Sequence, residues 1–107
     1  MRTEIRTKGL DISEDLRDQV ERRLRFALSR FASQIRQVEV QVADDEGLDK
    51  RCAITVHFNR GGEVFLAERC SRVEASVGRA ANRVARQVAN QLDRRHTRRS
   101  GVFRAVG

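Results

Sequence analysis

The sequence predicts an α+β domain, a two-layer β-α-β-β-β-α sandwich whose four-stranded sheet carries both helices on one face. Three observations lead to this fold class. A length of 107 residues suits one compact domain built of two layers. Alternating apolar residues mark the strands, and two apolar rows at helical spacing mark the helices. Because each central strand has only one strongly apolar face, both helices are expected to cover that face.

The first third of the chain predicts a strand followed by a helix. Residues 2–8 alternate around Ile5 and are typical of a short strand. Ser13 is suited to cap a helix, and the acidic residues Glu14 and Asp15 follow it in the first turn. The apolar row of this helix ends near Ala32 and comprises Leu16, Val20, Leu24, Ala27, Leu28 and Phe31. A strand–helix–strand start favours a right-handed crossover, which predicts a parallel first pair of strands.

The middle of the chain predicts an antiparallel meander. Alternation over 38–42 and again over 52–58 indicates two strands, joined by an acidic loop at 44–50. The glycines of Arg60-Gly61-Gly62 reach positive φ without steric cost, which favours a hairpin turn and a further strand over 63–67.

The last third predicts a long amphipathic helix. Ser71 and Glu74 have the spacing of a capping box. The expected buried row is Val73, Val77, Ala80, Ala81, Val84, Val88 and Leu92. The pattern stops after His96, so we expect a domain over 1–96 and a flexible basic tail over 97–107.

The net charge of +7 is concentrated in one part of the chain. Residues 69–107 hold ten arginines against two acids, a net +8, whereas residues 1–68 have a net charge of −1. Twenty of the 22 basic residues are arginine, whose planar fork of donors suits phosphate and whose guanidinium stacks on bases. This composition predicts a polyanionic partner.

The arginines of the long helix form a stripe opposite its valine row. At about 100° per residue, Arg79, Arg83, Arg86 and Arg94 lie within a quarter of a turn. Such neighbours repel each other in an isolated helix, and a row of phosphates would reverse the sign of that energy. The first helix adds Arg22, Arg23 and Arg25 beside the expected groove between the helices. We expect these seven arginines to bind RNA; the alternative is a solvated face that keeps the domain in solution.

Phe26 falls on the polar side of the first helix. Three interpretations stay open for it: stacking on an exposed base, packing against a neighbouring element, or a local bulge that turns the side chain elsewhere.

The sequence offers little support for catalysis. His57 and His96 stand apart from any nucleophile at a recognisable spacing, and His57 is expected to be solvated on the open face of the sheet. The acidic loop lacks the ligand spacing of a calcium site. Cys52 and Cys70 are too few for a zinc site or a disulfide scaffold and are expected to be small buried hydrophobes. We therefore expect no enzyme activity, cofactor, metal or small-molecule substrate.

With no long apolar run or secretory signal, we expect a cytoplasmic protein that does not contact membranes.

Three segments, at residues 12–17, 37–40 and 83–88, together resemble the ribosome hibernation promoting factor family, which includes the ribosome-associated inhibitor A proteins. They read Ile12-Ser13-Glu14-Asp15-Leu16-Arg17, Gln37-Val38-Glu39-Val40 and Arg83-Val84-Ala85-Arg86-Gln87-Val88. The resemblance covers residues 1 to about 95. Residues 72–78 depart from the family pattern by lacking its tyrosine and two acids, and the first helix is one residue longer near Phe26. The chain is thus similar to a divergent, short, single-domain member, without the second domain by which long members dimerise ribosomes.

The resemblance implies a bacterial protein on the small ribosomal subunit and its rRNA. There it would occupy the mRNA channel and the A and P tRNA sites, and inhibit translation by occlusion in stationary phase or under stress. The residues carried over as contacts are Arg79, Arg83 and Arg86 with Arg22, Arg23 and Arg25. Nothing in the residues indicates contact with a sigma factor, although such proteins have been labelled sigma-54 modulators.

Two other functions stay open at the level of sequence. The element order also resembles the double-stranded-RNA-binding domain with an added first strand, which predicts general binding of RNA duplexes. A regulatory module for an acidic protein partner is the second alternative. A bare sheet edge also leaves a weak homodimer open.

Overall fold

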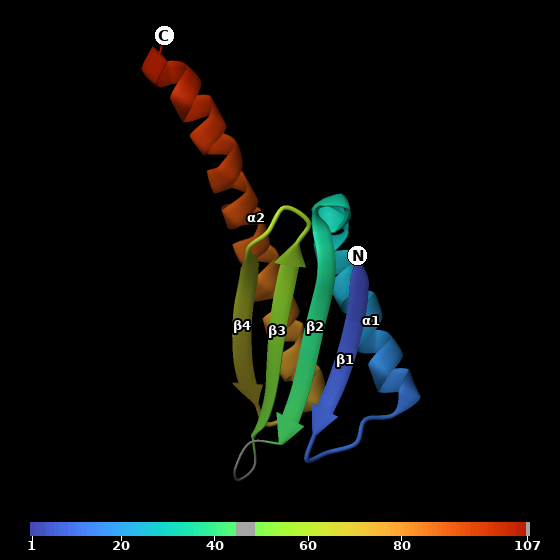
Figure 1. Cartoon of the computed structure of the whole chain (residues 1–107). Helices are drawn as coiled ribbons and strands as arrows, with labels where there is room; N and C mark the ends of the chain where they lie inside the picture. The colour runs from blue at the N-terminus through green and yellow to red at the C-terminus, as the bar shows by residue number, and fades with distance from the viewer. Residues whose placement is uncertain (45–48, 107) are drawn as a thin grey trace.

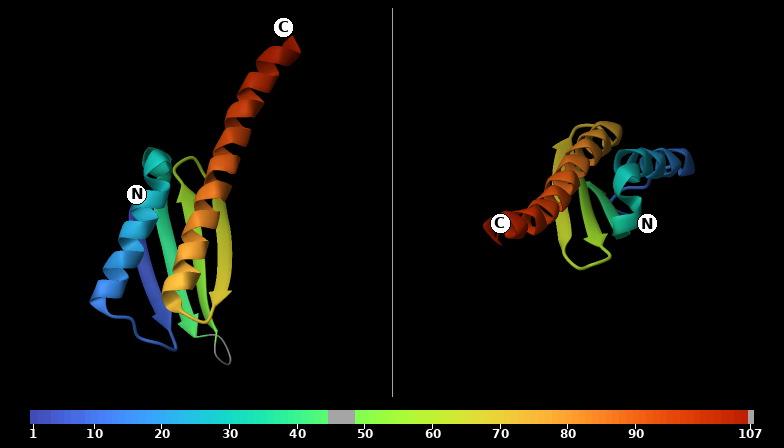
Figure 2. Two further views of the ribbon diagram at one scale, coloured as in Figure 1. Left: turned by 180° about the vertical axis from the view of Figure 1, so that it is seen from behind. Right: turned by 90° about the horizontal axis from the view of Figure 1, so that it is seen from above.

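The computed structural model describes residues 1–44 and 49–106, with side chains for 1–44 and 49–95. Its elements are β1 (Arg2–Lys8), α1 (Glu14–Leu28), the 3₁₀ helix η1 (Ser29–Gln34), β2 (Ile35–Asp44), β3 (Lys50–Phe58), β4 (Glu63–Cys70) and α2 (Val73–Val106). The four strands lie in the order β1-β2-β3-β4, and both helices cover one face of the sheet (Figures 1 and 2). The predicted two-layer α+β sandwich is confirmed.

The strand pairing matches the prediction. β1 runs parallel to β2, whereas β2 with β3 and β3 with β4 are antiparallel. Ile5 lies opposite Val40, Val40 opposite Ile54, and Ile54 opposite Leu66. An apolar row therefore crosses all four strands on the face that the helices cover.

The core lies between this sheet face and the two helices. Leu24 and Leu28 of α1 and Val84 and Val88 of α2 are completely buried against the strands. Cys52 is buried in the same cluster, as expected for a small hydrophobe, whereas Cys70 is only half-buried. Folding thus depends on the apolar side of each helix and leaves the opposite side free for other contacts.

Helix α1 ends earlier than the predicted Ala32. It ends at Leu28, and the chain tightens into η1. The hydroxyl of Ser29 donates to the carbonyl of Phe26 at 3.1 Å and satisfies a group that the helix end leaves free. The tighter turn keeps Phe31 packed on the core, which is why the apolar row continues beyond the α-helix.

Helix α2 differs from its prediction at both ends. The amide of Ser76 donates to the carbonyl of Arg72 at 3.1 Å, so the N-cap position is Arg72 and not Ser71. At the other end the helix continues past the sheet to Val106 (Figure 1), in a stretch that no proline interrupts. The side chains of residues 96–107 lie outside the described part, and the flexibility of 97–107 stays a prediction.

The turn between β3 and β4 has the backbone conformation that its glycines predicted. Gly61 and Gly62 have φ values of 85° and 88°, as the hairpin turn requires. Residues 45–48 of the predicted acidic loop are not described; at its base Lys50 Nζ and Asp44 Oδ1 are 2.6 Å apart. In the described stretches, no helix is long and apolar enough to cross a membrane.

Candidate nucleic-acid interface

A groove of about 820 Å³ runs between α1 and α2, which lie side by side on the sheet (Figure 2). Apolar side chains from both helices form part of its lining: Leu16, Val20, Ala27, Val77 and Ala85. Its polar lining is Gln19, Arg22, Arg23, Glu74 and Asn82, and Phe26 completes it. The groove therefore combines an apolar lining with guanidinium groups.

Arg23 reaches from α1 across to α2. A Cβ atom placed on Gly78 would lie 3.2 Å from Arg23 Nη2, so the guanidinium lies directly over the glycine and would have to shift slightly for any larger residue. An adjoining hollow of about 590 Å³ is lined by Arg23 together with Arg72 and Arg79 of α2. Arginines from both helices thus meet at one end of the groove.

Two of the seven predicted arginines are held by carboxylates. Arg83 forms an ion pair with Glu68 of β4, on the side of α2 away from α1. Arg25 Nη2 lies 2.7 Å from Glu21 Oε1 within α1. An arginine that already has a carboxylate partner gains less from a phosphate, because the existing pair must be broken or shared.

The other five predicted arginines are exposed: Arg22, Arg23, Arg79, Arg86 and Arg94. The groove and its hollow bring together Arg22, Arg23 and Arg79, whereas neither is lined by Arg86 or Arg94. RNA binding by these residues stays a prediction.

Phe26 is 85% exposed and lines the groove. It does not pack against a neighbouring element, and α1 is a regular α-helix from Glu14 to Leu28. Two of the three interpretations of Phe26, packing and a helix bulge, are therefore wrong.

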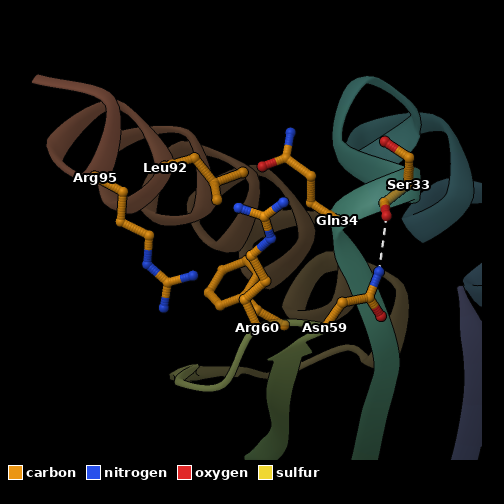
Figure 3. Close-up of a pocket in the computed structure, with 7 residues that line it drawn as sticks. Ser33, Gln34, Asn59, Arg60, Leu92 and Arg95 are labelled. Carbon is orange, nitrogen blue, oxygen red and sulfur yellow. Dashed lines mark hydrogen bonds between the residues drawn. The ribbon is translucent and has the colours of Figure 1, made fainter. Parts of the chain in front are cut away.

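Arg95, which no pattern in the sequence singles out, holds the end of the sheet. Its Nη2 donates to the carbonyl of Gly61 at 2.7 Å, and its guanidinium carbon lies 5.1 Å from the centroid of the Phe58 ring. Arg95 and Phe58 line a cavity of about 340 Å³, and Asn59 Nδ2 also donates to the carbonyl of Ser33 at 2.8 Å, the dashed line in Figure 3. These bonds join the hairpin turn to α2 and η1, and Arg95 therefore has a structural role.

The open face of the sheet has a different electrostatic character. His57, expected to be solvated, is instead half-buried between two carboxylates. Its Nε2 lies 3.5 Å from Glu39 and its Nδ1 lies 3.2 Å from Glu63, because the strand register places Glu63 directly opposite His57 and Glu39 on the diagonal. On the same face Arg6 pairs with Glu4 at 2.9 Å. Acids and bases alternate here, in contrast to the arginines beside the groove.

The described side chains offer little for catalysis. Burial raises the pKa of the Cys52 thiol to about 12, so that this thiol stays protonated and poorly nucleophilic at neutral pH. No group of three or more His, Cys, Asp and Glu side chains among the described residues is placed to hold a metal ion.

Arginine-bearing helices beside a groove are typical of nucleic-acid-binding domains. The N-terminal domain of Protein Y from Thermus thermophilus has a similar structure, with a TM-score of 0.72 and 27% sequence identity; the match covers 82% of this chain and 96% of that one. A ribosomal subunit interface protein from Coxiella burnetii shares the fold, with a TM-score of 0.76, 18% identity, and coverage of 87% and 99% of the two chains.

The sequence profile described as "Sigma 54 modulation protein / S30EA ribosomal protein" matches residues 3–96. The chain belongs to this family of ribosome-associated proteins, which confirms the resemblance seen in its sequence segments. Comparison with curated proteins finds no significant match.

Proposed function

We propose that the protein binds the small ribosomal subunit through its 16S rRNA and stops translation by occlusion. It occupies the mRNA channel and the A and P tRNA sites of idle ribosomes in the cytoplasm, under stress or in stationary phase. The observation that carries this proposal is the meeting of Arg22, Arg23 and Arg79 from two helices beside one groove, in a member of a ribosome-associated family.

Electrostatics support a polyanion as the partner. Arg22, Arg23 and Arg79 are exposed, and within the described ranges none of them forms an ion pair with a carboxylate. Guanidinium groups held this close repel each other, and rRNA phosphates would convert that repulsion into attraction. The family match and the descriptions of the structural neighbours, one of them a ribosomal subunit interface protein, support the ribosome as the source of the phosphates.

The mode of action follows from the same surface. A domain that covers the path of mRNA and tRNA needs affinity and shape and has no need of a reacting group. The groove residues contain one carboxylate, Glu74, and neither a histidine nor a cysteine. We therefore propose inhibition by reversible binding, without chemistry and without a cofactor.

Sedimentation with purified subunits tests the proposal. We expect the protein to sediment with small subunits and not with large ones, and to lose binding steeply between about 50 and 200 mM salt. Saturating mRNA with P-site tRNA should displace it. Failure to sediment with small subunits at low salt would refute the ribosomal target, and binding unaffected by mRNA and tRNA would refute the site.

Binding measurements with the same purified protein and subunits distinguish this proposal from the two other functions that the sequence leaves open. Equal affinity for arbitrary RNA duplexes and for small subunits would favour a general double-stranded-RNA-binding module. A protein partner that stays bound after nuclease treatment would favour a regulatory interaction module.

A further inference from the structure

We propose that Phe26 is a stacking platform for one unpaired nucleobase of the RNA that enters the groove between α1 and α2. This inference rests on the proposed function and adds to it a stacking contact with a base, whereas the arginines contact phosphates. It is carried by the exposure of Phe26, its place in the groove and the charges beside it.

Phe26 is exposed where most aromatic side chains would be covered. Only Met1, Phe26 and Phe65 are exposed large hydrophobic residues in the part of the chain that the structure describes, and Phe26 is the most exposed of them at 85%. Burying an aromatic ring removes a large apolar area from water. A partner that covers this ring therefore gains the free energy of burying it, because the ring stays exposed to water in the folded protein.

The surroundings of Phe26 indicate what kind of partner covers it. Arg22 and Arg23 precede it by four and three residues, so all three side chains share one side of α1 and line the same groove. A strand of RNA presents a flat apolar base and a charged phosphate a few ångströms apart. One turn of α1 offers a complement to each.

The charge of this turn favours RNA over an apolar protein surface. Arg22 and Arg23 have no carboxylate partner among the described side chains, so an apolar protein surface placed here would bury two unpaired cations. Phosphates would neutralise them instead. The groove volume of about 820 Å³ is within the range of sites that hold small organic ligands, and is large enough for a base turned out of its stack.

A tryptophan reporter tests stacking directly. The chain contains no tryptophan and no tyrosine, so Phe26→Trp introduces a single indole at the proposed platform. We expect a single-stranded RNA oligonucleotide to quench its fluorescence, and inorganic polyphosphate, which carries charge but no bases, to leave it nearly unchanged. Phe65→Trp is the matched control, because Phe65 is 57% exposed on the open face of the sheet. It should not be quenched by the oligonucleotide.

Affinity for small subunits provides the second measurement. Phe26→Ala should weaken binding by roughly ten-fold, while Phe26→Trp retains it, since stacking needs a flat ring. The salt dependence should stay the same because no phosphate contact is lost. Phe65→Ala should bind like wild type, and circular dichroism should show that both alanine variants are folded.

The outcomes separate this inference from the proposed function. If the wild-type protein does not bind small subunits, the proposed function fails, and quenching by the oligonucleotide still tests the platform. If the wild type binds and Phe26→Ala binds equally well, the platform is refuted. Weaker binding by Phe26→Ala without quenching by RNA would also refute it, and would indicate a ribosomal protein in the groove.

Discussion

The salt dependence of binding gives the sharpest test of the arginine surface. The structure leaves five of the seven predicted arginines without a carboxylate partner in its described part: Arg22, Arg23, Arg79, Arg86 and Arg94. Each phosphate contact contributes about −0.7 to −0.9 to the slope of log K against log salt. Five contacts predict a slope of roughly −3.5 to −4.5.

Replacing Arg79 and Arg86 by glutamine removes two of these contacts. The slope should become shallower by roughly 1.4 to 1.8, and affinity at low salt should fall. Arg83 is left in place because its removal would leave Glu68 without its partner. The matched control, Arg2→Gln with Lys8→Gln, removes the same charge from β1, where both side chains are exposed on the open face of the sheet.

Fluorescence anisotropy of labelled protein titrated with small subunits, at four or more salt concentrations, measures the slope. The control pair should keep the slope of the wild type within experimental error. An unchanged slope in the Arg79→Gln, Arg86→Gln variant would refute the interface on α2. An equal reduction in both double variants would show that net charge alone drives binding.

Three further predictions concern stability and reactivity. Ile54→Ala should lower the free energy of unfolding by about 2–5 kcal/mol in urea denaturation, because Ile54 is completely buried at the centre of the sheet; a loss below about 1 kcal/mol would contradict this. Ser13→Ala should cost about 1 kcal/mol in the same assay, because the Ser13 hydroxyl accepts the amide of Leu16 at 3.1 Å, and Ser13→Asp should restore most of it. Burial raises the pKa of the Cys52 thiol from its ordinary value of 9.0 to about 12, so its contribution to stability is fully present below pH 9 and is lost as the pH rises from 9 toward 12. Thiol titration at pH 8 should modify the half-buried Cys70 first and Cys52 only after unfolding; equal rates in the folded protein would argue against the buried site.

The fold was predictable because its determinants are local. The alternation of apolar residues predicted β1, β2 and β3, and the two glycines of the turn predicted the hairpin that leads to β4. The apolar row of α2 predicted which side of the helix is buried. Helix ends were less predictable, because the end of α1 depends on local bonds such as those from the amide and hydroxyl of Ser29 to the Phe26 carbonyl.

The state of individual arginines was not predictable, because it depends on contacts between distant residues. Glu68 lies 15 residues before Arg83, and Gly61 lies 34 residues before Arg95. Spacing along α2 places Arg83 and Arg94 in the same stripe, yet only the packing of α2 against β4 brings the Glu68 carboxylate to Arg83. Helical periodicity predicts which side chains share a face and leaves open which of them are already paired.

The structure therefore separates arginines that stabilise the fold from arginines that lie exposed beside the groove. Gly78 shows how a single residue affects an arginine of the second kind. Arg95 secures the hairpin turn and Arg83 secures β4, whereas Arg23 lies over a glycine whose missing side chain leaves it room. Gly78 belongs to the stretch 72–78 that lacks the acids usual in the family pattern. A carboxylate at this position would lie beside the Arg23 guanidinium and offset its charge. Glu74, the one acid of this stretch, lines the groove and the adjoining hollow, so Gly78 leaves Arg23, Arg72 and Arg79 with a single carboxylate there.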